Sequence, residues 1–225
     1  IQKSLANPTN GVDLNRFYPR GKDPKLSKQL GLENKFVVGY IGTLGLAHGL
    51  ETVLEAALII QQDQVNKEIL FLFVGDGDKK NYLAQLALKK GLKNVVFVDL
   101  VTKEQVSSYW SLLDVSIIHL KKASLFETVI PSKLFEGLGM GVPILHGVMG
   151  ESAKIIKSNN VGLTFEPENA KNLVSAIHTL KTDSKLLSTL RGNCHIAARK
   201  YDRSKLAKEM LKILEKIRAD CSKLD

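Results

Sequence analysis

Six short apolar segments recur along the chain, and longer stretches with a mixed polar and apolar pattern separate them. The segments are rich in valine, isoleucine and phenylalanine and show no alternation of apolar with polar positions. Short continuous apolar runs are typical of strands that are buried on both faces, as in a parallel sheet. The predicted strands span residues 35–41, 68–74, 94–98, 114–119, 142–145 and 162–165.

The stretches between and after these strands have the spacing of apolar residues that is typical of helices. The predicted helices span residues 50–61, 79–90, 103–112, 131–138, 151–158, 170–180, 184–200 and 203–218. Strands that alternate with helices imply right-handed crossover connections. The pattern therefore predicts an α/β fold: a Rossmann-like, doubly wound parallel sheet of about six strands with a C-terminal helical tail, in a single domain over residues 1–225.

The last predicted helix has an apolar face of its own. Leu206, Met210, Leu214 and Ile217 share one side of it, and lysines occupy the other. An amphipathic helix of this kind has to pack its apolar side against another surface.

Composition narrows the class of protein. The chain has 225 residues, of which 44% are apolar and 24% charged, as in a globular protein. It contains no signal-peptide pattern and no apolar run near the roughly 18 residues of a membrane span. Cys194 and Cys221 match no metal-binding spacing and are interpreted as reduced thiols of a cytoplasmic protein. The chain begins at Ile1, without Met or a capped first element, which favours a piece of a longer protein.

The charge is +9, and the last third, from Glu151 onward, holds 15 Lys and Arg against 9 Asp and Glu. Such a bias is typical either of a protein with an anionic partner or of a lysine-rich, solvated helical surface. Nucleic acid is disfavoured as the partner, because aromatic residues make up only 6% of the chain.

Ligands of doubly wound sheets bind beyond the carboxyl ends of the strands, so the turns that follow the strands are the candidate sites. The first is Gly42-Thr43-Leu44-Gly45, between strand 35–41 and a helix. Glycines allow a phosphate to approach the backbone, and a helix start offers free N–H groups. The turn is either such a phosphate contact or a tight strand-to-helix connection, and it lacks the dinucleotide fingerprint G-x-G-x-x-G.

Two other turns carry glycine and a carboxylate. The turn 74–78 is interpreted mainly as a structural turn in which Asp78 caps the next helix. Gly150 and Glu151 stand at the start of helix 151–158, where Glu151 either favours the helix dipole or faces a ligand.

The segment 126–137 contains the largest group of candidate ligand-binding residues. Pro131 suits the first position of a helix, which places Ser132 and Lys133 in its first turn beside unpaired N–H groups. Glu136 follows Lys133 by three residues and lies on the same helix face. The sequence therefore predicts either an anion site with a carboxylate for ribose hydroxyls, or a surface ion pair between Glu136 and Lys133.

Other reactive side chains are expected to be structural. His119 and His146 end apolar strands and are predicted in core or rim positions, and Trp110 is predicted to pack on its helix.

The order of several short motifs resembles one family. They are Asn10-Gly11-Val12-Asp13 with Phe17 and Pro19, the first loop from Gly42 to Leu50, Val74-Gly75-Asp76-Gly77, Asn94-Val95-Val96-Phe97, Asp114-Val115, and Glu136 with Gly141-Val142-Pro143. Together they resemble the C-terminal, donor-binding domain of family 4 glycosyltransferases, the glycosyl transferases group 1, which have the GT-B fold of two facing Rossmann-like domains. The Pro-Ser-Lys run at 131–133 resembles the subgroup that builds capsule, exopolysaccharide and O-antigen units.

The resemblance implies a retaining hexosyltransferase that uses a nucleotide sugar, such as UDP-hexose or UDP-N-acetylhexosamine, and needs no metal or cofactor. Gly42 to Gly45, Ser132 and Lys133 would bind the diphosphate, Glu136 the ribose, and the segment Asp99-Leu100-Val101 the base. Gly150 and Glu151 would shape the sugar or phosphate side.

The implied partners are a missing N-terminal acceptor domain and a lipid-linked or glycan acceptor. Residues 1–20 would form the segment between the two domains, and helix 203–218 would contact the missing one. The implied location is the cytoplasm or the inner face of the plasma membrane. The isolated domain is expected to be inactive.

The chain departs from the family at two places. The first motif glutamate is replaced by Thr128 or displaced by one residue to Glu127, for which a catalytic role beside Lys133 is predicted. Thr43 and His48 stand where the family usually has the arginine and lysine that hold the diphosphate, which makes Lys133 the remaining cation. A nucleotide-sugar 2-epimerase of the same fold and a non-catalytic nucleotide-binding or scaffold domain stay open as alternatives.

Overall fold

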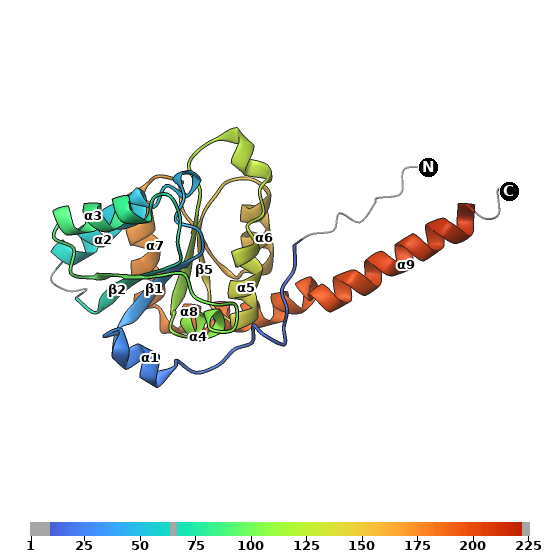
Figure 1. The fold of residues 1–225 in the computed structure, drawn as a ribbon, viewed down its shortest axis with the longest axis horizontal. Helices are drawn as coiled ribbons and strands as arrows, with labels where there is room; N and C mark the ends of the chain where they lie inside the picture. The colour runs from blue at the N-terminus through green and yellow to red at the C-terminus, as the bar shows by residue number, and fades with distance from the viewer. Residues whose placement is uncertain (1–9, 64–66, 222–225) are drawn as a thin grey trace.

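A computed structural model describes residues 10–63 and 67–221, although no side chain beyond Arg218 is described. Six parallel strands form one sheet in the order β3-β2-β1-β4-β5-β6 (Figure 1). The strands are β1 Phe36–Ile41, β2 Ile69–Val74, β3 Val95–Val98, β4 Val115–His119, β5 Ile144–Gly147 and β6 Gly162–Thr164. The predicted Rossmann-like fold class is confirmed.

Helices cover both faces of this sheet, as the unbroken apolar pattern of the strands requires. The helices are α1 Pro24–Gln29, α2 Glu51–Gln62, α3 Lys80–Lys89, α4 Val106–Ser111, α5 Ser132–Met140, α6 Glu151–Asn159, α7 Ala170–Thr182, α8 Ser184–Ala198 and α9 Arg203–Cys221. Short 3-10 turns are η1 Leu46–His48, η2 Ser124–Thr128 and η3 Arg199–Tyr201.

Successive residues of β1 enter two different cores. Val38 and Tyr40 pack with side chains of α2, α3 and α7, whereas Val37 and Ile41 pack with side chains of α4, α5 and α8. Trp110, on α4, is completely buried in the second core, as predicted. The sheet is thus the shared wall of two apolar layers, which explains why its strands show no polar alternation.

Several predicted boundaries are wrong by a few residues. The strand predicted at 142–145 is observed at Ile144–Gly147, because Gly141 is left-handed (φ +69°) and ends α5 two residues later than predicted. Pro131 is the N-cap of α5 and not its first residue. Lys79, and not Asp78, stands at the N-cap of α3, without a side-chain hydrogen bond.

Several short elements were not predicted from the sequence, among them helix α1 and the turn η2. Helix α1 begins with Pro24 after Asp23, whose carboxylate accepts the N–H of Leu26 at 3.0 Å, a start signal that is readable in the sequence. The turn η2 has no capping side chain and no buried residue, so no periodic pattern marks it.

Asp114 organises the edge of the sheet where the strands begin. Its carboxylate accepts the N–H of Val37 at 2.8 Å, and it pairs with Lys22 at 2.6 Å and with Arg191 at 2.9 Å. Val37 lies in β1 and Arg191 in α8, so the Asp114 carboxylate connects three segments that are distant in sequence.

The N-terminal segment of the described chain lies beside the start of α9. Val12 donates to the Tyr201 carbonyl at 2.8 Å and accepts from the N–H of Arg203 at 3.0 Å. From there α9 projects away from the sheet (Figure 1) and exposes Leu211, Leu214 and Ile217. Residues 1–9 of the predicted interdomain segment lie outside the described residues. No helix in the described ranges is both long enough and apolar enough to cross a membrane.

The loops after β1 and β2 interlock at the opposite edge of the sheet. Gly42 donates to the Val74 carbonyl at 2.9 Å, and Leu44 donates to the Asp76 carbonyl at 2.9 Å. A Cβ atom on Gly75, whose φ is +141°, would lie 2.1 Å from the Gly42 carbonyl oxygen. Only glycine allows this approach of the two backbones.

Gly75→Ala is therefore expected to lower the free energy of unfolding by at least about 2 kcal/mol, because it adds both a backbone clash and a strained φ. Gly192→Ala is the matched control. Gly192 lies inside α8 with nothing within 4 Å of its added Cβ, so alanine is expected to stabilise the protein by roughly 0.5–1 kcal/mol. Urea unfolding of both variants measures the difference, and equal effects would contradict the role of the interlocked loops.

Candidate functional site

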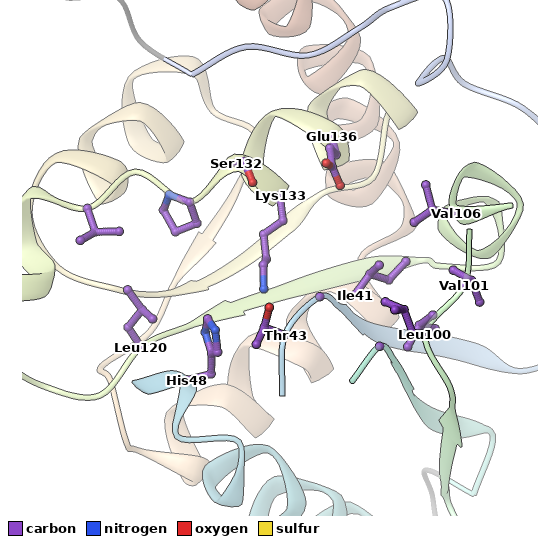
Figure 2. Close-up of a pocket in the computed structure, with 15 residues that line it drawn as sticks. Ile41, Thr43, His48, Leu100, Val101, Val106, Leu120, Ser132, Lys133 and Glu136 are labelled. Atoms are coloured by element: carbon purple, nitrogen blue, oxygen red, sulfur yellow. The ribbon is translucent and has the colours of Figure 1, made fainter. Parts of the chain in front are cut away.

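A cleft of about 410 Å³ opens beyond the carboxyl ends of the central strands (Figure 2). The chain reverses its direction of strand addition between β1 and β4, and ligands of such sheets bind at this switch point. The cleft lies there and has the size of small-molecule sites. Its lining comes from the β1, β2, β3 and β4 ends and from α5: Ile41, Gly42, Thr43, His48, Val74, Gly75, Leu100, Val101, Val106, Leu120, Val129, Pro131, Ser132, Lys133 and Glu136.

Lys133 reaches across the cleft from the first turn of α5. Its side chain extends toward Thr43 and His48 (Figure 2), and its ammonium donates a hydrogen bond to the Tyr40 hydroxyl at 2.9 Å. The same nitrogen lies 4.2 Å from the centre of the Tyr40 ring. Burial lowers the pKa of Lys133 to about 8, although the nearby Glu136 carboxylate counteracts this.

Glu136 lies one turn further along α5, on the side of the cleft that Val106 closes (Figure 2). Burial raises its pKa, and the nearby indole of Trp110 and the charge of Lys133 oppose that rise. A partly buried carboxylate that receives few hydrogen bonds from the protein is unfavourable, so this position favours a ligand that supplies O–H donors.

The start of α5 offers further donors to the cleft. Ser132 is exposed there, and no side chain caps the helix at Pro131. The N–H groups of Ser132 and Lys133 make no hydrogen bond in the described part of the chain. Unpaired N–H groups and the positive end of the helix dipole form a common anion-binding arrangement.

The first loop contributes less backbone than predicted. The N–H groups of Gly42 and Leu44 are used by the loop after β2, and the Leu44 side chain is buried in the core, outside the cleft. The N–H groups of Thr43 and Gly45 make no hydrogen bond within residues 10–63 and 67–221. Gly45 does not line the cleft, whereas Gly42 and Thr43 do, and of these two only Thr43 has an N–H that is left for a ligand.

His48 adds no positive charge at neutral pH. Burial and the charge of Lys133 lower its pKa to about 4. Its carbonyl is bound by the Nδ1 of His119 at 2.7 Å, while the His119 Nε2 accepts the N–H of Glu168 at 2.9 Å. His119 is therefore a buried structural link between two loops, as predicted, and not a catalytic group.

An apolar wall faces Lys133 and Glu136. Leu100, Val101 and Val106 form it, and the Leu100 side chain is 74% exposed. Asp99 lies outside the cleft, and its exposed carboxylate pairs with Lys80. Of the segment predicted at the base, Asp99-Leu100-Val101, the structure brings Leu100 and Val101 to the cleft but not Asp99.

Glu127, Gly150 and Glu151 lie next to the cleft but do not line it. A Cβ atom on Gly150 would be 2.0 Å from the Glu127 carbonyl oxygen, so the start of α6 packs on the backbone of η2. The side chains of Glu127 and Glu151 are both exposed. The structure thus groups Lys133 with Glu136 and leaves Glu127 apart from them.

Sequence reasoning missed Tyr40. Its signal was present: β1 is otherwise aliphatic and aromatic, and a buried tyrosine hydroxyl requires a partner. The hydroxyl donates to the Thr43 carbonyl close by, but Lys133, which donates to it, comes from a segment more than 90 positions away. Among the described side chains there is no group of three or more His, Cys, Asp or Glu that could hold a metal ion.

Residues 22–201 match the family model of the Glycosyl transferases group 1. A protein of Escherichia coli K12 named for a glycosyl transferase of colanic acid biosynthesis, WcaI, is 30% identical over 157 residues, which is 68% of this chain and 37% of the relative. The E. coli UDP-Gal:alpha-D-GlcNAc-diphosphoundecaprenol alpha-1,3-galactosyltransferase is 28% identical, over 82% of this chain and 47% of that enzyme. The chain thus spans less than half the length of these two relatives.

Solved structures share the fold. HepE of Anabaena, in complex with UDP and glucose, superposes with a TM-score of 0.77 at 21% identity, over 92% of this chain and 55% of that one. The C-terminal domain of the group 1 glycosyl transferase LpcC from Francisella tularensis has a TM-score of 0.70 at 21% identity, over 86% of this chain and 100% of that domain. With the family model matched from the residues before α1 to the end of η3 and the six-stranded GT-B half-fold in place, this chain belongs to the Glycosyl transferases group 1 family.

Proposed function

We propose that this chain is the donor-binding half of a retaining glycosyltransferase that uses a nucleoside diphosphate sugar. The observation that carries this proposal is the pairing, in one cleft, of the Lys133 ammonium with the open start of α5 and with Glu136 one turn away. The ammonium and the open helix start can bind a diphosphate, and the Glu136 carboxylate can accept hydrogen bonds from the hydroxyls of a ribose.

In the proposed reaction the bond between the anomeric carbon and the diphosphate oxygen breaks. The acceptor hydroxyl oxygen forms the new bond on the same face of the sugar, and its proton leaves with the diphosphate or a base. Negative charge develops on the departing oxygen, where Lys133, Ser132 and the N–H groups of α5 would stabilise it. Such preorganised donors act most strongly in a partly desolvated site, and this scheme requires no metal.

Glu136 would accept hydrogen bonds from the ribose. Each hydrogen bond to a charged group contributes about 1.5–3 kcal/mol, and the burial that raises the pKa of Glu136 makes such donors more valuable. The base would rest on the apolar wall of Leu100 and Val101. Gly150 and Glu151 would shape the sugar or phosphate side, and Glu127 stays a predicted catalytic residue, although none of the three lines the cleft.

Two relatives support uridine as the base and a lipid-linked acceptor. The E. coli galactosyltransferase is named for UDP-Gal and a diphosphoundecaprenol acceptor, and the HepE structure holds UDP with glucose. We therefore propose UDP-hexose or UDP-N-acetylhexosamine as the donor, surface polysaccharide synthesis as the process, and the cytoplasmic face of the membrane as the place.

The acceptor half of the enzyme would pack against α9. Its residues Leu211, Leu214 and Ile217 are exposed, and the chain near Val12 leaves the domain beside the start of α9. An apolar helix face of this kind is normally covered in a complete protein. The isolated chain is accordingly expected to bind nucleotide weakly and to transfer no sugar.

Calorimetric titration with UDP tests the site. Lys133→Met retains the aliphatic stem but removes the charge, and Glu136→Gln retains the shape. Each is expected to weaken UDP binding about tenfold or more, which corresponds to about 1.4 kcal/mol. Lys89→Met on α3 and Glu55→Gln on α2 are matched controls, because both residues are exposed and lie outside the cleft, and both should bind as the wild type does.

If neither cleft variant weakens binding, the nucleotide binds elsewhere on the sheet. If the wild-type chain does not bind UDP, GDP or ADP at millimolar concentration, the donor-binding role of this chain is contradicted and a scaffold domain is favoured.

The affinity for UDP is also expected to depend on pH. The protonated Lys133 binds the anion, and its pKa in the free protein is about 8, so affinity should be highest below pH 8 and fall as the pH rises through that value. His48, with a pKa of about 4, stays neutral over this range, and a phosphate with a pKa near 6 is already ionised. Titrations between about pH 7 and 9.5 measure the slope, which should vanish in Lys133→Met. A slope that persists in this variant would assign the titration to another group.

A further inference from the structure

Tyr40 contacts Lys133 in two ways. The Lys133 ammonium donates to the Tyr40 hydroxyl at 2.9 Å and lies 4.2 Å from the centre of the ring. The Tyr40 hydroxyl in turn donates to the Thr43 carbonyl at 2.7 Å. Because its own proton is used there, the lone pairs of the hydroxyl are available to the ammonium.

The remaining sides of the ammonium are also restricted. A Cβ atom on Gly42 would lie 2.6 Å from Lys133 Nζ, so the backbone of the first loop stands directly beside it. The His48 ring packs edge-on against the Tyr40 ring, with 5.8 Å between their centres. The ring of Tyr40 is fixed because it is 1% exposed and packs on Phe73.

A lysine side chain ordinarily has many rotamers and loses them when it binds a ligand. Here, one of the three N–H donors is used on Tyr40, and two are left for a ligand in the cleft. The contacts with Tyr40 and Gly42 order this side chain before any ligand binds.

We propose that Tyr40 is a positioning residue, which holds the Lys133 ammonium at the point in the cleft where the diphosphate of the donor binds. This proposal rests on the proposed function, since it assumes that Lys133 binds the anion. It assigns Tyr40 a role through Lys133 and no contact with the donor, because Tyr40 does not line the cleft.

Tyr40→Phe tests the proposal, because phenylalanine keeps the ring and its packing but removes the hydroxyl. The variant is expected to bind UDP about three- to tenfold more weakly, the range for loss of one hydrogen bond. In a Lys133→Met background the same change should have no further effect, since the residue through which Tyr40 acts is absent. Tyr82→Phe, on the exposed surface of α3, is the matched control and should bind as the wild type does.

The double-variant measurement separates positioning from a purely structural role. If Tyr40→Phe weakens UDP binding equally with and without Lys133, Tyr40 supports the loop through Thr43 only, and the proposal is overturned. If Lys133→Met binds UDP as well as the wild type does, the proposed function itself fails.

The pH profile provides a second readout. The groups that face the ammonium are Tyr40, the neutral His48 and Glu136. Without the hydroxyl, which favours the charged form, the alkaline fall in UDP affinity should begin at a lower pH in Tyr40→Phe. An unchanged profile contradicts positioning.

NMR of the wild-type chain with ¹⁵Nζ-labelled lysine keeps the proposal testable if Tyr40→Phe does not fold. An ammonium held by Tyr40 should give a signal with slow proton exchange, whereas a rapidly exchanging, averaged Lys133 signal would overturn the proposal.

Discussion

The candidate site depends on the close approach of α5 to the backbone of the first loop. The Lys133 nitrogen lies where a side chain on residue 42 would be, and the Gly42 carbonyl in turn lies where a side chain on residue 75 would be. Three segments, separated widely in sequence, are therefore stacked with no space for a Cβ between them. Any side chain in this stack would displace either the ammonium or the second loop. These glycines allow backbone segments to pack closely, and this role outweighs phosphate contact. In keeping with it, the N–H groups of Gly42 and Leu44 donate to carbonyls at the end of β2 and in the loop after it.

This arrangement changes how an anion would be bound. A diphosphate needs positive charge, and the first loop supplies none here, because it has no Lys or Arg and burial keeps its His48 neutral. The charge instead comes from α5, where one ammonium and the unpaired N–H groups of a helix start converge. Because burial partly desolvates Lys133, its charged form is less stable than that of an exposed lysine, and a bound anion would stabilise the charge. Anion binding and the protonation of Lys133 are thereby coupled.

The two edges of the sheet differ in how their polar groups are paired. At the edge where the strands begin, Asp114 joins β1, α8 and Lys22 through charge-assisted hydrogen bonds, and no cleft residue is involved. At the other edge, glycine turns, a partly buried lysine and a partly buried carboxylate surround open space. The polar groups at the first edge bind one another, whereas those at the second edge remain available to a ligand such as the proposed donor.

The fold class could be predicted from the sequence, because β1 to β6 are uninterrupted apolar runs and the intervening stretches are periodic, and these are local properties of the chain. Lys133 and Glu136 could also be predicted as neighbours, since a spacing of three residues on a helix places them on one face. The sequence could not predict that Tyr40 supports Lys133, that Leu44 is buried, or that Asp99 and Glu127 lie outside the cleft. These facts depend on how loops from different strands pack on one another. Only the tertiary structure decides such contacts, because they join residues tens of positions apart whose distance no local pattern encodes.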